Sequence, residues 1–335
     1  MISSGTSHST VEPLSADNVI PLRSHAATSG GLDYLTAPDG HRIPVRHWPV
    51  ANPLAVIHIA HGMAEHSGCY ADVAPRLNAA GYAVVAHDHR CHGHSVPAAA
   101  LGTASASQHW NAICADMLHV NTHIRSLYPK QRIALLGHSM GSFISMDFMG
   151  KHSDRVDLLL LEGSNYEAPW FCNVARGIAV FEGWRQGQDG RSPIIHALSF
   201  GGFNKKFKNP RTAFDWISRD NAVVDRYVAD PLCGFQCSNG YWNGFLAGLA
   251  RIYKPANFRG IRKNLPIYLL AGTEDQVGKK SRGVIALRDQ LEKAGCQPVK
   301  MVLYTDARHD LLHETNRDEV ISDLLGWLDV KLKTA

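Results

Sequence analysis

A serine lies between two glycines at the end of an apolar run, in the stretch RIALLGHSMGS at 132–142. Serine and glycine are both common, so the pattern G-x-S-x-G is a weak signal until the surrounding elements give it meaning. The apolar run predicts a buried strand, and the residues after it predict a helix over 139–151. A serine on a sharp strand-to-helix turn is exposed beside backbone N–H groups that favour negative charge. We therefore predict that Ser139 is a nucleophile.

A serine hydroxyl becomes reactive only when a base removes its proton and an acid orients that base. In a strand–turn–helix arrangement of this kind, the acid and then the base follow the serine along the chain. Asp275 ends the apolar run PIYLLAGTED, and His309 follows the run VKMVLYTDAR. Both are therefore expected at the same sheet edge as Ser139. Glu274 and Asp310 compete for the role of the acid, but we interpret both as exposed loop carboxylates.

The oxyanion formed in acyl transfer needs two hydrogen-bond donors. The backbone N–H of Met140, the residue after Ser139, is the first expected donor. The second is the N–H of Met63, in the loop HGMAEHSGCY that follows the run PLAVIHIAHG. In the same loop, Glu65 and His66 either shape the backbone or contact the polar head of a substrate. We favour the loop-shaping interpretation for these two residues.

Metal binding is the main competing chemistry. Residues 86–95, AHDHRCHGHS, hold His87, His89, Cys91, His92 and His94. Such a density of donors could bind a metal, but the spacing fits no usual zinc site. Cys233 and Cys237 lie four residues apart without a second pair, which argues against a metal or a disulfide there. We therefore expect no metal and no cofactor.

The elements that would position these residues alternate along the chain. Apolar runs predict strands at 53–62, 82–90, 132–137, 156–163, 266–275 and 299–307. Helical patterns over 70–80, 110–127, 139–151, 281–295 and 316–333 separate or follow them. Residues 31–50 predict a hairpin that turns at Pro38-Asp39-Gly40. This alternation is typical of an α/β fold with a mostly parallel sheet and helices on both faces.

Residues 166–255 interrupt the alternation. No run there predicts a sheet strand, yet 15 of the chain's 28 aromatic residues lie between Trp170 and Tyr253. An inserted helical cap over the carboxyl ends of the strands would explain both facts, and a small satellite core would explain the aromatic residues equally well. The expected division is a core at 31–165 and 256–335, with a cap (lid) insertion at 166–255.

The composition is that of an ordinary globular protein, with 45% hydrophobic and 19% charged residues among 335. A net charge of +4 without a long basic run argues against a nucleic-acid partner. Seven scattered cysteines argue against a disulfide framework and for a reducing compartment. Residues 1–30 lack the apolar core of a signal peptide and predict a flexible leader. No apolar run has the roughly 20 residues of a membrane span, so we expect a cytoplasmic protein without stable membrane insertion.

Four motifs together carry a family resemblance: HGMAEHSGCY at 61–70, DHRCHGHS at 88–95, GHSMGS at 137–142 and DARHDLLHE at 306–314. In this order and spacing, the chain resembles the monoacylglycerol lipase/lysophospholipase family of α/β-hydrolases from about residue 31 to 333. The resemblance implies the α/β-hydrolase fold with a cap, a triad of Ser139, Asp275 and His309, and ester hydrolysis without a cofactor. The chain departs from the family at Cys69, where Arg is usual, and at Cys91, where Gly is usual. These departures concern loop shape and substrate preference rather than the triad.

We therefore predict a serine hydrolase that cleaves a small-molecule acyl ester, such as a monoacylglycerol, a lysophospholipid or a simpler carboxylic ester. A thioesterase, an amidase or an acyltransferase could use the same triad. A catalytically inactive hydrolase fold that binds a ligand or a partner is an alternative from another class. An intact Ser, Asp and His, each at its expected strand end, argue against it.

Overall fold

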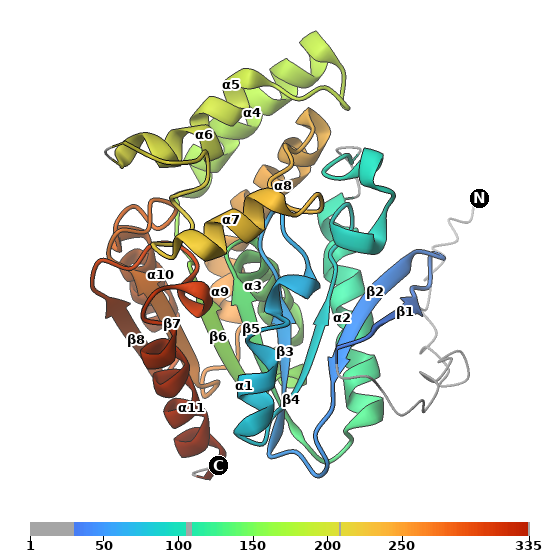
Figure 1. Ribbon diagram of the computed structural model, residues 1–335, viewed down its shortest axis with the longest axis vertical. Helices are drawn as coiled ribbons and strands as arrows, with labels where there is room; N and C mark the ends of the chain where they lie inside the picture. The colour runs from blue at the N-terminus through green and yellow to red at the C-terminus, as the bar shows by residue number, and fades with distance from the viewer. Residues whose placement is uncertain (1–29, 105–108, 208, 334–335) are drawn as a thin grey trace, which may run out of the picture.

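The computed structural model describes residues 30–104, 109–207 and 209–333, so almost all of the expected leader at 1–30 lies outside the described residues. The centre of the fold is an eight-stranded sheet in the order β1-β2-β4-β3-β5-β6-β7-β8 (Figure 1). The first two pairings, β1 with β2 and β2 with β4, are antiparallel, and the others are parallel. The strands are β1 (Leu32–Thr36), β2 (Arg42–Trp48), β3 (Ala55–Ala60), β4 (Ala83–His87), β5 (Arg132–His138), β6 (Leu158–Glu162), β7 (Ile267–Gly272) and β8 (Val299–Tyr304).

All six strands predicted from the apolar runs are confirmed, and β1 and β2 form the predicted hairpin. The helices are α1 (Ala74–Ala79), α2 (His109–Leu127), α3 (Met140–His152), α4 (Pro169–Gln186), α5 (Pro193–Leu198), α6 (Phe200–Phe203), α7 (Asn221–Ala229), α8 (Asn239–Ile252), α9 (Pro255–Gly260), α10 (Arg282–Lys293) and α11 (Arg317–Lys333). The helix predicted over 70–80 is wrong in length. A separate 3₁₀ turn forms at Ser67–Tyr70, and Pro75, which has no backbone N–H, lies in the first turn of α1.

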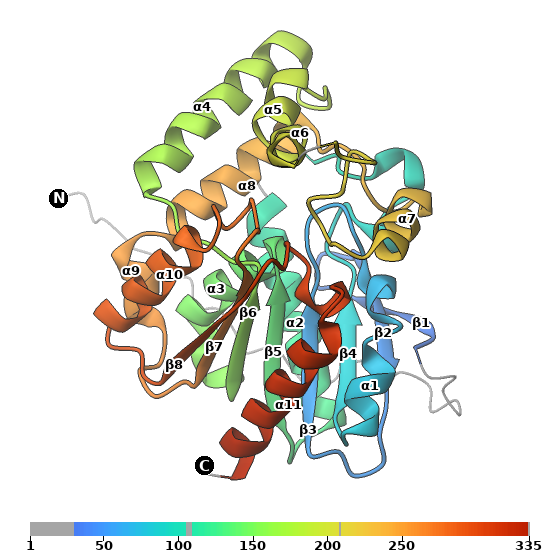
Figure 2. The same ribbon diagram turned by 60° about the vertical axis from the view of Figure 1, so that its left-hand side comes forward.

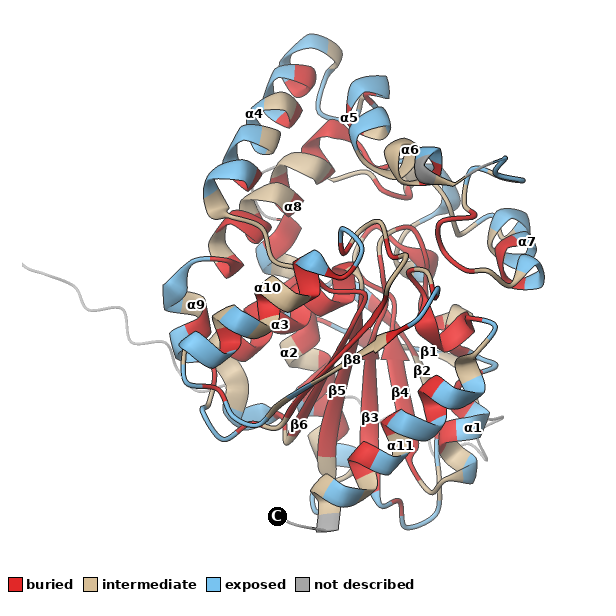
Figure 3. Cartoon of the chain, turned by 90° about the vertical axis from the view of Figure 1, so that its left-hand side faces the viewer, coloured by how far each residue is buried: buried red, intermediate tan, exposed pale blue. Residues whose placement is uncertain are grey.

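The sheet is buried on both faces, as the β6 sequence illustrates. Side chains alternate along a strand, so the run of four leucines divides between two cores. Leu158 and Leu160 pack in the cluster that includes residues of α1 and α11. Leu159 and Leu161 pack in the cluster that includes residues of α2, α3, α9 and α10. Figure 2 shows α1 and α11 in front of the sheet, and Figure 3 shows that the central strands are buried.

The segment between β6 and β7 is helical, and none of its described residues forms a strand. Figures 1 and 2 both place α4 to α8 beyond the edge at which the parallel strands end. The long helices α4 and α8 pack against each other. The helix α4 exposes Trp170, Phe181 and Trp184, so a satellite core does not account for these aromatic residues. In the described parts of the chain, no helix combines the length and the apolar character that a membrane crossing requires.

Candidate active site

Ser139 is the single residue between the end of β5 at His138 and the start of α3. Its φ of 50° and ψ of −117° form a conformation that costs a non-glycine residue about 1–3 kcal/mol. The neighbouring glycines allow this turn. A Cβ on Gly137 would lie 2.6 Å from Ser145 Oγ, and one on Gly141 would overlap the carbonyl oxygen of Ala60. The structure therefore places Ser139 on a strained turn where β3, β5 and α3 approach closely.

Asp275 and His309 lie on the loops that follow β7 and β8, and both are buried. His309 Nδ1 donates a hydrogen bond of 2.9 Å to Asp275 Oδ1. The same oxygen accepts the backbone N–H of Val277 at 2.9 Å, which fixes the carboxylate. Because Nδ1 carries the proton, Nε2 of the neutral imidazole is free to accept one. Asp275 thus fixes the orientation of the His309 ring.

Ser139 and His309 line the same small cavity of about 20 Å³. Phe200, Trp216 and Ile217, all from the inserted segment, line it as well, and the Trp216 ring lies 5.2 Å from the His309 ring. His309 Nε2 is buried and has no hydrogen-bond partner among the described residues. The serine–histidine hydrogen bond is therefore not formed in this structure. Catalytic hydrogen bonds commonly tighten only when the substrate is bound.

The two expected oxyanion donors belong to residues near Ser139. Met140 is the first residue of α3, and Met63 lies in the loop after β3 and lines the cavity with Ser139. Within the described residues, neither backbone N–H donates a hydrogen bond to another residue. The first N–H groups of a helix lack partners in the helix itself, and such donors can stabilise an oxyanion. Both groups are therefore available for that role.

The two competing carboxylates have other partners. Glu274 forms an ion pair of 2.7 Å with Lys280 and is partly exposed. The interpretation of Asp310 as an exposed loop carboxylate is wrong, because this side chain is buried and accepts hydrogen bonds from His313 Nδ1 at 2.9 Å. Burial alone would raise the pKa of Asp310, but the neighbouring imidazoles, His313 first, hold it below its usual value. The carboxylate that accepts the hydrogen bond of His309 Nδ1 is therefore that of Asp275.

Glu65 and His66 fix the loop that carries Met63. Glu65 accepts hydrogen bonds from the backbone N–H of Gly62 and, at 3.0 Å, from the hydroxyl of Tyr70. It also lines the cavity that contains Ser139. His66 Nε2 lies 3.0 Å from a carboxylate oxygen of Asp230, which belongs to the inserted segment. These contacts support the loop-shaping interpretation of both residues.

Residues of the histidine-rich stretch at 86–95 contact neighbouring parts of the fold. Among the described residues, the groups of side chains close enough to hold a metal ion include none of the five candidates in this stretch. His87 Nδ1 lies 3.1 Å from His58 Nε2, and burial lowers the pKa of each ring to about 3. Asp88 organises the loop, because it accepts the backbone N–H groups of Ser67 and His94 at 2.8 Å each.

Sequence reasoning missed Glu162, which ends β6 and is buried. Its Oε1 accepts the backbone N–H groups of Leu311 at 2.5 Å and Leu312 at 3.1 Å, in the loop that carries His309. Its Oε2 lies 3.6 Å from Nδ1 of His138, the residue before Ser139. The signal in the sequence that could have identified Glu162 is its place directly after the apolar run VDLLLL.

Comparisons with known proteins agree with this geometry. Residues 51–316 match the family model Hydrolase_4, described as serine aminopeptidase, S33. A monoacylglycerol lipase of Mycolicibacterium smegmatis is 26% identical over 296 residues, which cover 86% of this chain and 93% of that protein. A monoglyceride lipase of Homo sapiens is 26% identical over 311 residues, which cover 91% of this chain and 92% of that protein.

The solved structures show the fold. A thermostable carboxyl esterase from Bacillus coagulans, in complex with glycerol, matches with a TM-score of 0.82 at 22% identity. The match covers 91% of this chain and 100% of that chain. The family model covers most of the chain, and the sheet has the order and direction of strands described above. The chain therefore belongs to the Hydrolase_4 family and has the α/β-hydrolase fold.

Proposed function

We propose that this carboxylic ester hydrolase acts on monoacylglycerols or similar small acyl esters through Ser139, His309 and Asp275. The observation that carries the proposal is the hydrogen bond between His309 and Asp275, together with the small cavity that both His309 and Ser139 line. The relatives named as monoacylglycerol or monoglyceride lipases support the substrate class. In the proposed mechanism this chain supplies the nucleophile, the base and the oxyanion donors, and water is the co-reactant.

The mechanism follows from the positions of the side chains. His309 Nε2 accepts the proton of Ser139 as its hydroxyl attacks the ester carbonyl, and Asp275 stabilises the resulting imidazolium. The backbone N–H groups of Met63 and Met140 bind the oxyanion. The alcohol leaves with the proton from His309, and an acyl-enzyme remains. A water molecule activated by His309 then releases the acid and restores Ser139.

The inserted segment is proposed to act as a cap that opens for the substrate. A cavity of about 20 Å³ holds about one water molecule and no ester. A larger cavity of about 550 Å³ lies next to it, and Glu65, Ile217, Tyr227 and Asp310 line both. Movement of Ile217 and its neighbours would join the two spaces. The combined space would then accept a glycerol head and part of an acyl chain.

A fluorophosphonate probe tests the nucleophile directly. The purified protein should react with one probe molecule per chain. Ser139→Ala should abolish this labelling and reduce ester turnover by a factor on the order of 10⁴ to 10⁶. Ser126→Ala, on the exposed side of α2, is the matched control and should behave like the wild type. Labelling that persists in Ser139→Ala would assign the nucleophile to another residue.

A substrate panel tests the acyl bond that is cleaved. We expect monoacylglycerols and p-nitrophenyl esters to be hydrolysed faster than acyl-CoA thioesters and amino-acid anilides. Faster turnover of anilides would favour the peptidase activity in the family's description. Probe labelling without turnover of any of these substrates would leave an acyltransferase or a binding module on the same fold.

A further inference from the structure

Two turns present possible metal ligands at the same spacing, and both contribute to the lining of the larger cavity. The segments HSGC at 66–69 and DPLC at 230–233 each place a donor residue three positions before a cysteine. Each turn is closed by a backbone hydrogen bond of 3.0 Å, from Cys69 N–H to the His66 carbonyl and from Cys233 N–H to the Asp230 carbonyl. Ligands separated by two residues on a tight turn are typical of zinc sites.

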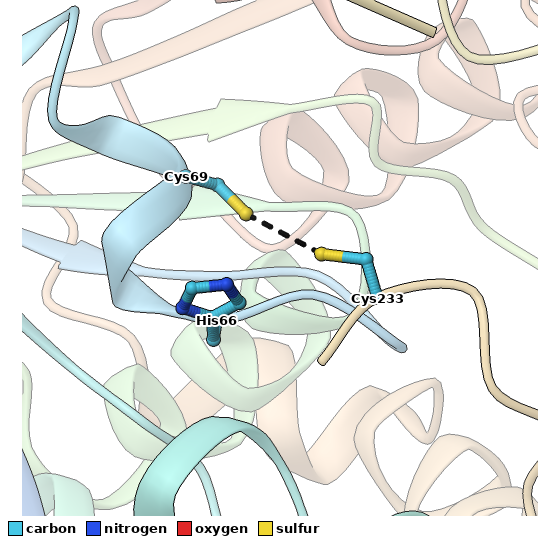
Figure 4. Close-up of side chains that lie close together, drawn as sticks. All are labelled: His66, Cys69 and Cys233. Atoms are coloured by element: carbon cyan, nitrogen blue, oxygen red, sulfur yellow. Dashed lines mark hydrogen bonds between the residues drawn. The ribbon is translucent and has the colours of Figure 1, made fainter. Parts of the chain in front are cut away.

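Three of these side chains meet at the cavity wall, and the fourth, Asp230, contacts one of them. Figure 4 shows the thiols of Cys69 and Cys233 pointing toward each other above the ring of His66, with their sulfur atoms 3.7 Å apart. One donor atom from each of these three residues lies within 4.8 Å of the other two. Asp230 Oδ2 lies 3.0 Å from His66 Nε2. The first turn belongs to the core and the second to the segment between α7 and α8.

The sulfur separation matches the geometry of a tetrahedral zinc site. A Zn–S bond of about 2.3 Å gives a sulfur–sulfur edge of about 3.8 Å in a regular tetrahedron. A disulfide would instead require about 2.05 Å between the two sulfur atoms. The observed 3.7 Å is therefore the spacing at which one ion can bind both sulfur atoms with little movement.

We propose that His66, Cys69 and Cys233 bind a divalent ion of the zinc class and that Asp230 supplies the fourth donor. Two thiolates and an imidazole select zinc or a similar borderline-soft ion over magnesium or calcium, which prefer oxygen ligands. Cys69, Asp230 and Cys233 line the cavity of about 550 Å³, and the buried His66 lies behind them in contact with Asp230.

Binding changes the protonation of the ligands. The ion replaces the thiol protons, because only thiolates bind the metal strongly. In the metal-free chain, Gly68 N–H donates to His66 Nδ1 at 3.1 Å, so the ring proton lies on Nε2. Coordination through Nε2 moves this proton to Nδ1 and ends the contact with Gly68. The bound ion then joins the core loop that carries Met63 to the inserted segment, at the wall of the larger cavity.

Cobalt(II) titration of the full chain tests the site without reference to ester hydrolysis. The reduced protein, freed of metal with a chelator, should bind one cobalt(II) ion with the intense near-ultraviolet absorption of thiolate-to-cobalt charge transfer. Zinc should displace the cobalt at one equivalent, and a large excess of magnesium should not. Cys69→Ser and Cys233→Ser should each weaken binding at least 100-fold. Cys237→Ala, which removes a buried thiol four residues from Cys233, should leave the affinity for cobalt(II) unchanged.

Wild-type protein provides a second measurement in case a cysteine variant does not fold. Zinc should protect Cys69 and Cys233 together from alkylation by iodoacetamide, as measured by peptide mass spectrometry, and magnesium should not. Zinc should also raise the melting temperature of the wild type. Cobalt binding without thiolate absorption, or binding retained in both serine variants, would place the ion elsewhere and overturn the proposal. Loss of both thiols to a disulfide, without metal binding, would overturn it too.

Discussion

Glu162 and His138 lie directly opposite each other in the register of β6 and β5, with Glu162 Oε2 3.6 Å from His138 Nδ1. The other oxygen of the same carboxylate holds the loop that follows His309, through the N–H groups of Leu311 and Leu312. One buried carboxylate therefore contacts both the residue that precedes the proposed nucleophile and the loop that carries the proposed base.

The pair predicts a pH-dependent contribution to stability. Burial opposes a charge on His138, but Glu162, followed by Glu65 and Asp310, raises its pKa to about 10. In the unfolded chain, the pKa of histidine is about 6.5. The stabilisation is therefore complete below about pH 6.5 and is lost as the pH rises through 10. We expect the difference in unfolding free energy between the wild type and His138→Gln to shrink from pH 7 to pH 10 in urea titrations. A constant difference would contradict a charged His138.

The assignment of the acid predicts unequal effects of two neighbouring substitutions. Asp275→Asn should reduce kcat by about 10⁴, because the amide cannot hold His309 in the required tautomer. Glu274→Gln should stay close to the wild type, since this carboxylate pairs with Lys280 instead. The measurement is steady-state turnover of a p-nitrophenyl ester, with circular dichroism to verify folding. The reverse order of effects would assign the acid to Glu274.

Local sequence patterns predicted the strands and the positions of Ser139, Asp275 and His309 in the turns that follow β5, β7 and β8. Each of these predictions depends only on a short apolar run and the residues that end it. The buried state of Asp310 could not be predicted in this way. It depends on His313, whose other ring nitrogen lies 3.1 Å from Asp72, 241 residues away in the chain. Cys69 and Cys233 are likewise separated by 164 positions. A spacing rule applied to one segment cannot detect a contact that two distant turns make only in the fold.

The approach of α3 to β3 predicts opposite effects for two glycine substitutions. Gly141→Ala should destabilise the fold by about 1–3 kcal/mol and reduce turnover, since the new methyl group would overlap the carbonyl oxygen of Ala60. Gly326→Ala is the control, because nothing lies within 4 Å of the new group in α11. It should stabilise the protein by about 0.5–1 kcal/mol through helix propensity. Urea denaturation measures both changes, and equal stabilities for the two variants would contradict the close approach.

The proposed cap predicts how turnover depends on acyl length. Each CH₂ moved from water into an apolar pocket contributes about 0.8 kcal/mol, so kcat/KM should rise by at most about fourfold per carbon. The rise should continue beyond acetate and then flatten at medium or long chains, when the joined cavities are full. A series of p-nitrophenyl esters from two to sixteen carbons, each below its solubility limit, measures the profile.

Trp216→Ala provides the structural control for this profile. The Trp216 ring stacks on Phe200 at a centroid distance of 5.6 Å and lies 5.2 Å from the His309 ring, so it separates the proposed base from the inserted helices. Its removal should lengthen the preferred acyl chain while leaving fluorophosphonate labelling of Ser139 intact. A wild-type maximum at acetyl or propionyl esters, unchanged in Trp216→Ala, would contradict an acyl pocket under the inserted segment. The chain would then be a small-ester carboxylesterase that uses the same serine, histidine and aspartate.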